Sequence, residues 1–277
     1  MQEDPIVIVG AARTPMGGFQ GSLAPMSAPE LGGYAIQAAI ERAGIYPEDV
    51  EDLIMGLCLF AGVKQAPARQ AAHLAGIPWN AGATTISKMC GSAMKATMLA
   101  HDNILAGSHD IMVAGGMESM TNAPYILPQA RNGYRLGNGD TARDHMFIDG
   151  LEDAFEEGRL MGTFAEDTAE HYQFTREAQD NYAIESLTRA KNAVEDGSFD
   201  QEVVSVTVKT RKGDANISSD EQPFNANIEK IPQLKPAFRK NGTVTPANSS
   251  SISDGAAALV LMKRSEADKR GLSPKAV

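Results

Sequence analysis

Apolar and polar positions alternate in blocks along the first 114 residues. Continuous apolar runs at 6–9, 52–60 and 110–114 predict strands that are buried on both faces. The segments between these runs have helix-forming composition and end near glycine: 29–43, 66–75 and 93–106. This alternation predicts an α/β fold whose sheet is mixed, mostly parallel, and covered by helices on both faces.

The pattern changes after Met117. Residues 121–247 are richer in Asn, Asp, Arg, Gly and Pro, and helices are predicted near 164–172 and 176–195. This stretch is too long for a loop, so we interpret it as an inserted α+β domain. The apolar run 256–262 then predicts a strand that rejoins the sheet. The expected organisation is a discontinuous domain, 1–120 with 248–277, that carries an insertion at 121–247.

Composition excludes several classes of protein. The net charge of −10 argues against a nucleic-acid binder that relies on overall basic charge. Two cysteines in 277 residues indicate a reducing compartment and no disulfide framework. No stretch is apolar enough to span a bilayer, and the acidic start lacks the features of a leader peptide. We therefore expect a cytoplasmic protein with no membrane partner.

Cys90 has the most informative position in the chain. It falls between a predicted strand end near Ser87 and the helix that starts near Ala93. The free N–H groups and the dipole of that helix favour a thiolate, and Gly91 lets an acyl group approach the backbone. Cys90 is therefore a candidate acyl-accepting nucleophile. The alternative is a small buried cysteine that caps the helix.

Five motifs resemble those of the thiolase family, in its acetyl-CoA acetyltransferase branch. They cover the chain in order: Val-Gly-Ala-Ala-Arg-Thr-Pro at 9–15, Pro-Ala-Arg-Gln-Ala at 67–71, the Cys90 run at 87–96, Ala-Gly-Gly-Met-Glu-Ser-Met at 114–120, and the segment 242–258 with its Asn-Ser-Ser-Ser and Asp-Gly-Ala-Ala-Ala stretches.

The resemblance implies the N-terminal half of a thiolase with its loop domain, which carries most coenzyme A contacts. It implies reversible Claisen condensation and thiolysis through an acyl-cysteine on Cys90, most commonly with acetyl-CoA. Each step builds an oxyanion, and the Cys90 N–H would be one donor to it. Coenzyme A thioesters are the substrates, with no separate cofactor and no metal. A homodimer or homotetramer is expected.

The resemblance also implies four residues that bind coenzyme A or its acyl group. Ser250 matches a serine that contacts the pantetheine amide. Leu151 and Met161 match positions that line the pantetheine tunnel and acyl pocket. Lys235 matches a basic position near the adenine and 3′-phosphate. The alternatives are a turn serine, two core residues and a solvated surface lysine.

The sequence also departs from the family pattern. A thiolase second half brings an Asn-Glu turn, a Gly-His-Pro motif with the activating histidine, and a second cysteine in a glycine-rich loop, and these 277 residues contain none of them. Cys58 lies in an apolar run and is expected to be a packed strand residue. We therefore expect this polypeptide to be inactive alone. Leu160 stands where short-chain biosynthetic thiolases have a histidine, which weakens strict acetoacetyl specificity.

Three alternatives remain at this point. The first is a 3-ketoacyl-CoA thiolase of broader chain length. The second is a non-catalytic thiolase-like module that binds coenzyme A esters or lipids. The third is a decarboxylating or synthase-type relative, which should lack the Gly-Gly-Met-Glu-Ser turn.

Overall fold

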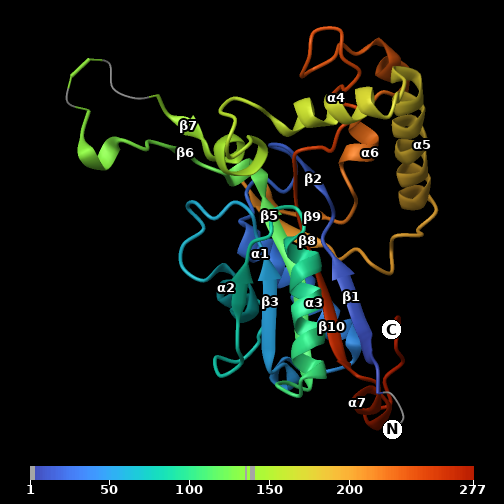
Figure 1. Cartoon of the computed structure of the whole chain (residues 1–277). Helices are drawn as coiled ribbons and strands as arrows, with labels where there is room; N and C mark the ends of the chain where they lie inside the picture. Colours follow the sequence, from blue (N-terminus) through green and yellow to red (C-terminus); the bar gives the residue numbers. More distant parts are fainter. Residues whose placement is uncertain (1–3, 135, 138–140) are drawn as a thin grey trace.

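The computed structural model describes residues 4–134, 136–137 and 141–277, and its centre is a six-stranded mixed sheet (Figure 1). The strands follow the order β1 (Ile6–Arg13), β10 (Ser253–Lys263), β5 (Ile111–Ser119), β3 (Asp52–Gly56) and β4 (Thr84–Ile86), while β2 (Gly17–Gly18) pairs with β10. The pairs of β3 with β4 and β5 are parallel, and the three pairs of β10 are antiparallel. The expected mixed α/β fold is confirmed. The sheet is less parallel than expected, because the returning strand 256–262 inserts antiparallel between β1 and β5.

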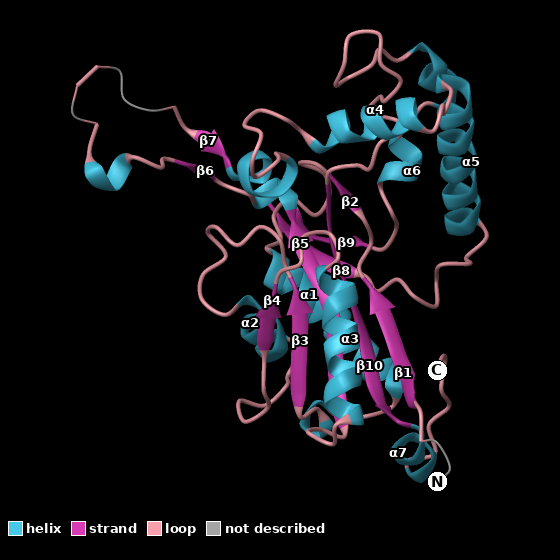
Figure 2. Cartoon of the chain, viewed as in Figure 1, coloured by secondary structure: helices cyan, strands magenta, loops and turns pink. Residues whose placement is uncertain are grey.

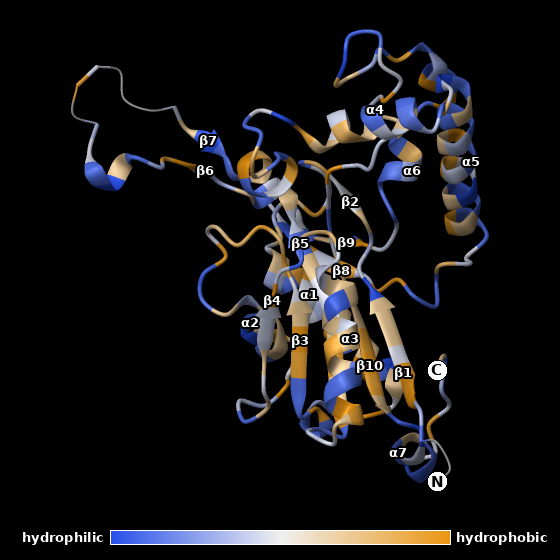
Figure 3. Ribbon diagram, viewed as in Figure 1, coloured by the Kyte–Doolittle hydropathy of each residue, from blue (hydrophilic) through white to orange (hydrophobic). Residues whose placement is uncertain are grey.

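Helices cover both faces of this sheet, so its strands are apolar at successive positions. Met55 belongs to the core that contains α1 (Ala28–Ala43) and α2 (Pro67–Leu74). Its neighbour Ile54 belongs to the opposite core, which contains α3 (Ser92–Leu105). Figure 3 shows the resulting hydrophobic colouring of the central strands. This two-sided burial explains the continuous apolar runs in the sequence.

The start and end of α1 follow from local sequence signals. The backbone N–H and hydroxyl of Ser27 both donate to the Glu30 carboxylate, at 2.8 and 2.6 Å. Pro29 suits the first turn of the helix, and Gly44 ends it in the left-handed conformation at φ +75°. The helix therefore matches its predicted range to within one residue.

The chain between β5 and β10 forms two lobes beyond the strand ends (Figure 2). One lobe is the extended hairpin of β6 (Tyr125–Ile126) and β7 (Arg143–Asp144). The other contains α4 (Met161–His171), α5 (Arg176–Glu195) and the short α6 (Gln222–Asn225), and the two longer helices match the predicted ones. The antiparallel pair β8 (Val206–Thr210) and β9 (Gly213–Ile217) does not belong to either lobe, because Val206 and Val208 are buried in the core beside α1.

Arg13 at the end of β1 ties the insertion to the sheet. Its guanidinium donates to both oxygens of Asp220, at 2.7 and 2.9 Å, and to Glu202 at 2.6 Å. After β10 the chain forms α7 (Arg264–Lys269). None of the helices in the described ranges combines the length and apolarity needed to cross a bilayer.

Candidate active site

Cys90 lies in a tight turn between β4 and α3. The N–H of Gly91 donates to the carbonyl of Lys88 at 3.1 Å, and the N–H of Ser92 donates to the carbonyl of Met89 at 3.0 Å. The backbone of Met89 lies in the left-handed region at φ +47°, which residues other than glycine rarely adopt. Strain of this kind persists where surrounding contacts hold it, and it often marks a functional turn. The expected strand-to-helix position of Cys90 is therefore present.

The Ser92 side chain holds this turn from inside. Ser92 is buried at 3% exposure, and its hydroxyl oxygen accepts the N–H of Lys88 at 2.8 Å. The same hydroxyl donates to the carbonyl of Met89. These two hydrogen bonds tie Ser92, which follows Cys90, to the backbone of Lys88 and Met89, which precede it. The turn is thus built before any ligand arrives.

The exposed Cys90 side chain opens onto a cavity of about 330 Å³ where β3, β5 and β10 meet the start of α3. Its lining is mostly apolar and includes Leu57, Cys58, Leu59, Met89, Cys90, Ala93, Met117, Glu118, Met120 and Leu151. Within the described part of the chain, nothing accepts a hydrogen bond from the Cys90 N–H. This unpaired N–H belongs to a residue that lines the cavity.

Cys58 also lines the cavity, which corrects its expected place in a packed strand. The strand β3 ends at Gly56, so Cys58 lies beyond it and is half-buried. Burial, together with the nearby Glu118 carboxylate, raises the pKa of the Cys58 thiol from 9.0 to about 11. Its sulfur lies 4.0 Å from the Ser92 hydroxyl oxygen. At neutral pH Cys58 is therefore a protonated thiol and a poor base.

Glu118 is the one carboxylic acid side chain among the residues that line the cavity, and sequence reasoning missed it. Its carboxylate accepts the N–H of Cys58 at 2.8 Å and that of Leu59 at 3.4 Å. Burial raises the pKa of Glu118, although these hydrogen bonds act in the opposite direction. The available signal was a carboxylate two residues after the Gly-Gly pair at 115–116, within the last part of β5.

None of the five histidines, all of which are described, lines this cavity. His145 is buried, its Nδ1 lies 2.6 Å from Asp149, and its Nε2 accepts the N–H of Ala61 at 3.2 Å. That acceptor site is occupied, so His145 is not a free base. His73 stacks on Trp79, with ring centroids 4.4 Å apart.

The structure brings together only two of the five predicted site residues. Leu151 lines the cavity of Cys90. Ser250 instead lines a separate cavity of about 670 Å³ beside α5 and α6. Met161 is 46% exposed at the start of α4, and Lys235 is exposed on the surface. The proposed ligand roles of Ser250, Met161 and Lys235 remain predictions.

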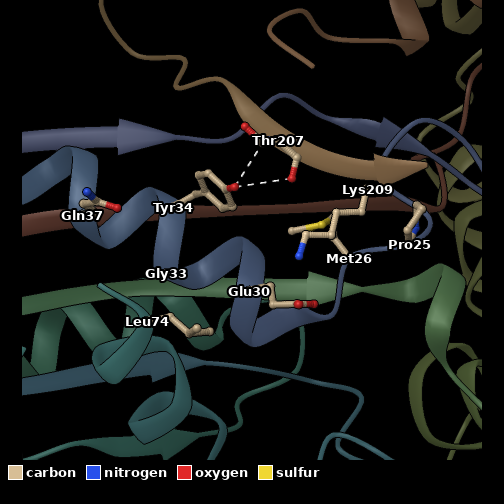
Figure 4. A pocket seen from close by; sticks show the side chains of 9 residues that line it. All are labelled: Pro25, Met26, Glu30, Gly33, Tyr34, Gln37, Leu74, Thr207 and Lys209. Carbon is tan, nitrogen blue, oxygen red and sulfur yellow. Dashed lines mark hydrogen bonds between the residues drawn. The ribbon is translucent and has the colours of Figure 1, made fainter. Parts of the chain in front are cut away.

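Another cavity, of about 530 Å³, lies between α1 and β8 (Figure 4). Its polar groups serve local structure: the Tyr34 hydroxyl bonds the backbone N–H and carbonyl of Thr207, at 3.3 and 3.4 Å, and Glu30 caps α1. Neither of the two cysteines lines it. The smaller cavity with Cys90 is the better candidate. Across the described residues, His, Cys, Asp and Glu form no group that could hold a metal ion.

Comparisons with known proteins show which family and which relatives this chain is similar to. The family described as "Thiolase, N-terminal domain" matches residues 6–265. An acetyl-CoA acetyltransferase of Cupriavidus necator is 49% identical over 273 residues, which are 98% of this chain and 69% of that protein. A cytosolic acetyl-CoA acetyltransferase of Gibberella zeae is 45% identical, over 98% of this chain and 68% of its own. The solved structure of an acetyl-CoA acetyltransferase from Syntrophomonas wolfei has a TM-score of 0.91 at 42% identity, and the match covers 98% of this chain and 68% of that one.

Proposed function

Because the chain belongs to the thiolase family, we propose that it is an acetyl-CoA C-acetyltransferase that forms an acyl-cysteine on Cys90. The observation that supports this best is the exposed Cys90 in a preformed turn, facing a mostly apolar cavity with a free backbone N–H. The matched relatives are named acetyl-CoA acetyltransferases, which favours this activity over a broader-chain 3-ketoacyl-CoA thiolase.

In the first step the Cys90 sulfur attacks the thioester carbonyl of acetyl-CoA. The Cys90 thiol gives up its proton as its carbon–sulfur bond forms, the carbon–sulfur bond to coenzyme A breaks, and the leaving coenzyme A thiolate takes up a proton in exchange, so the products are the acyl-cysteine and free coenzyme A. Negative charge develops on the carbonyl oxygen during this step. The free N–H of Cys90, at the start of α3, is placed to donate to that oxygen. The thioester is already activated, so the step needs no separate cofactor.

The second step removes an α-proton from another acetyl-CoA, and its carbanion attacks the acyl-cysteine. We propose that these 277 residues alone do not turn over, as the sequence leads us to expect, and that they stop at the acyl-enzyme. No histidine lines the cavity, and Cys58 stays protonated because its pKa is about 11. A base supplied by another polypeptide segment would complete the turnover.

We further propose a cytoplasmic enzyme that acts as a homodimer or homotetramer. A relative named for the cytosol supports the compartment, and recovery of the tagged protein in mitochondria would contradict it. Three apolar side chains are exposed along α3, namely Met94, Met98 and Leu105, and they support coverage by further protein.

The test is to mix the purified chain with acetyl-CoA and to measure released coenzyme A with a thiol-sensitive dye after the protein is removed. The proposal predicts a burst close to one coenzyme A per chain, absent in Cys90→Ala. Binding of acetyl-CoA without any burst would instead favour the non-catalytic module.

A further inference from the structure

One wall of the Cys90 cavity is formed by Leu57, Cys58 and Leu59, which begin the segment 57–61 that leaves the sheet after β3. The N–H of Leu57 still donates to the carbonyl of Ile86 at 3.1 Å. The next N–H groups, of Cys58 and Leu59, have no strand to pair with and donate to Glu118. The N–H of Ala61 donates to His145. Two side chains thus take the place of a neighbouring strand along this wall.

A carboxylate suits this place because both of its oxygens accept hydrogen bonds. A glutamine of the same size would present an oxygen at one end and an N–H₂ donor at the other, so one of the two N–H groups would face a donor. Burial works against the ionised form, as the raised pKa of Glu118 shows. A carboxyl group whose two oxygens both accept backbone N–H groups inside a mostly apolar cavity points to a role in function rather than in stability alone.

We propose that Glu118 is a positioning residue that holds the Cys58–Leu59 backbone in place and so sets the size of the acyl group that fits against Cys90. Glu118 acts through this wall and does not touch the reacting atoms. A shift of the Leu59 backbone would also move the Leu59 side chain, which lines the cavity. This side chain lies close to Gly150, since a Cβ added at Gly150 would be 3.2 Å from Leu59 Cδ2. The acyl-size claim rests on the proposed acylation of Cys90.

The experiment compares Glu118→Gln with a matched control, Glu221→Gln. The Glu221 carboxylate also accepts two backbone N–H groups, those of Gly18 and Ser22, both at 3.0 Å, and it does not line the Cys90 cavity. Cys90 is acylated with acetyl-CoA and with hexanoyl-CoA, and alkylated with iodoacetamide and with N-cyclohexylmaleimide. Hydrogen exchange of the Cys58–Leu59 amides is followed in parallel.

In Glu118→Gln we expect faster exchange of the Cys58 and Leu59 amides. We also expect the rate of Cys90 modification by the larger reagent, divided by the rate for the smaller one, to rise by about fivefold for both the acyl-CoA pair and the alkylating pair, since one methylene in an apolar pocket changes discrimination by about tenfold or more. The control should change neither. General destabilisation would alter both rates alike and leave the ratios constant. Unchanged exchange or unchanged ratios would overturn the proposal.

Failure of the proposed function gives a different pattern. If acyl-CoA does not acylate even the unmodified chain, the acylation proposal and the acyl-size claim both fall, while exchange and the alkylation ratio still decide whether Glu118 holds the wall. If Glu118→Gln does not fold, Glu118→Asp replaces it. Aspartate keeps the charge but is too short to reach both N–H groups, so the same ratios should rise by a smaller factor, and constant ratios would again overturn the proposal.

Discussion

Substituting Gly56 by alanine should displace the turn that carries Cys90. A Cβ added at Gly56 would lie 2.6 Å from the carbonyl carbon of Ser92 and 2.7 Å from the backbone nitrogen of Ala93. Both atoms belong to the backbone of the first turn of α3, which cannot rotate away as a side chain can. The strand β5 also lies close to the start of α3, because a Cβ added at Gly116 would be 2.7 Å from the Ala93 Cβ.

The size of the effect follows from these distances. Relieving the contact at Gly56 requires the start of α3 to move by about 0.8 Å, since ordinary van der Waals contact begins near 3.4 Å. Overpacking of this kind lowers the free energy of unfolding by about 1–3 kcal/mol. A misplacement near 1 Å can slow catalysis by about 100-fold. We therefore expect acetylation of Cys90 to slow by about tenfold or more while the chain still folds.

The assay is the rate of coenzyme A release from acetyl-CoA, together with the thermal unfolding midpoint. Gly18→Ala is the control, because its new Cβ would meet Glu221 at an ordinary 3.8 Å, and it should behave like the unmodified chain. Acetylation of Gly56→Ala at the unmodified rate would refute the claim that seating of α3 on the sheet positions Cys90.

Three further predictions concern the cavity and the anchoring of the insertion. Iodoacetamide at pH 8 should label Cys90 far faster than Cys58, because a pKa near 11 leaves about one Cys58 side chain in a thousand as thiolate. The rate of Cys58 labelling should rise by about tenfold with each pH unit until it levels off near pH 11. Comparable labelling rates of the two cysteines at pH 8, measured by peptide mapping, would contradict this. Ser92→Ala should lower the free energy of unfolding by about 1–2 kcal/mol and slow the alkylation of Cys90, because the turn loses two buried hydrogen bonds. If denaturant titration and labelling kinetics match those of the unmodified chain, Ser92 does not hold the Cys90 turn. Asp220→Ala should lower the free energy of unfolding by about 2–3 kcal/mol, because Arg13 loses a carboxylate that accepts its hydrogen bonds through both oxygens. A decrease below about 0.5 kcal/mol would show that this ion pair does not anchor the insertion.

The long strands of the central sheet could be predicted from the sequence, but their directions could not. The runs at 52–56 and 256–262 are apolar at successive positions because helices cover both faces of the sheet. That pattern is the same in either direction, so the antiparallel place of β10 between β1 and β5 depends on long-range pairing.

The nucleophile could be predicted from the sequence, but the residues around it could not. Cys90 could be singled out because the strand end, the glycine and the helix start are neighbours in sequence. The contact between Glu118 and Cys58 joins residues 60 positions apart, and it forms only because β3 and β5 are adjacent. The same limit explains why Ser250 and Leu151, both suggested by resemblance, line different cavities.

Peptide mapping after brief exposure to acetyl-CoA tests the central claim most directly. The account predicts one acetyl group on the peptide that contains Cys90, none on the peptide that contains Cys58, and loss of the label when excess free coenzyme A is added. An unlabelled Cys90, or a label that is distributed over both cysteines and lysines and resists coenzyme A, would contradict it.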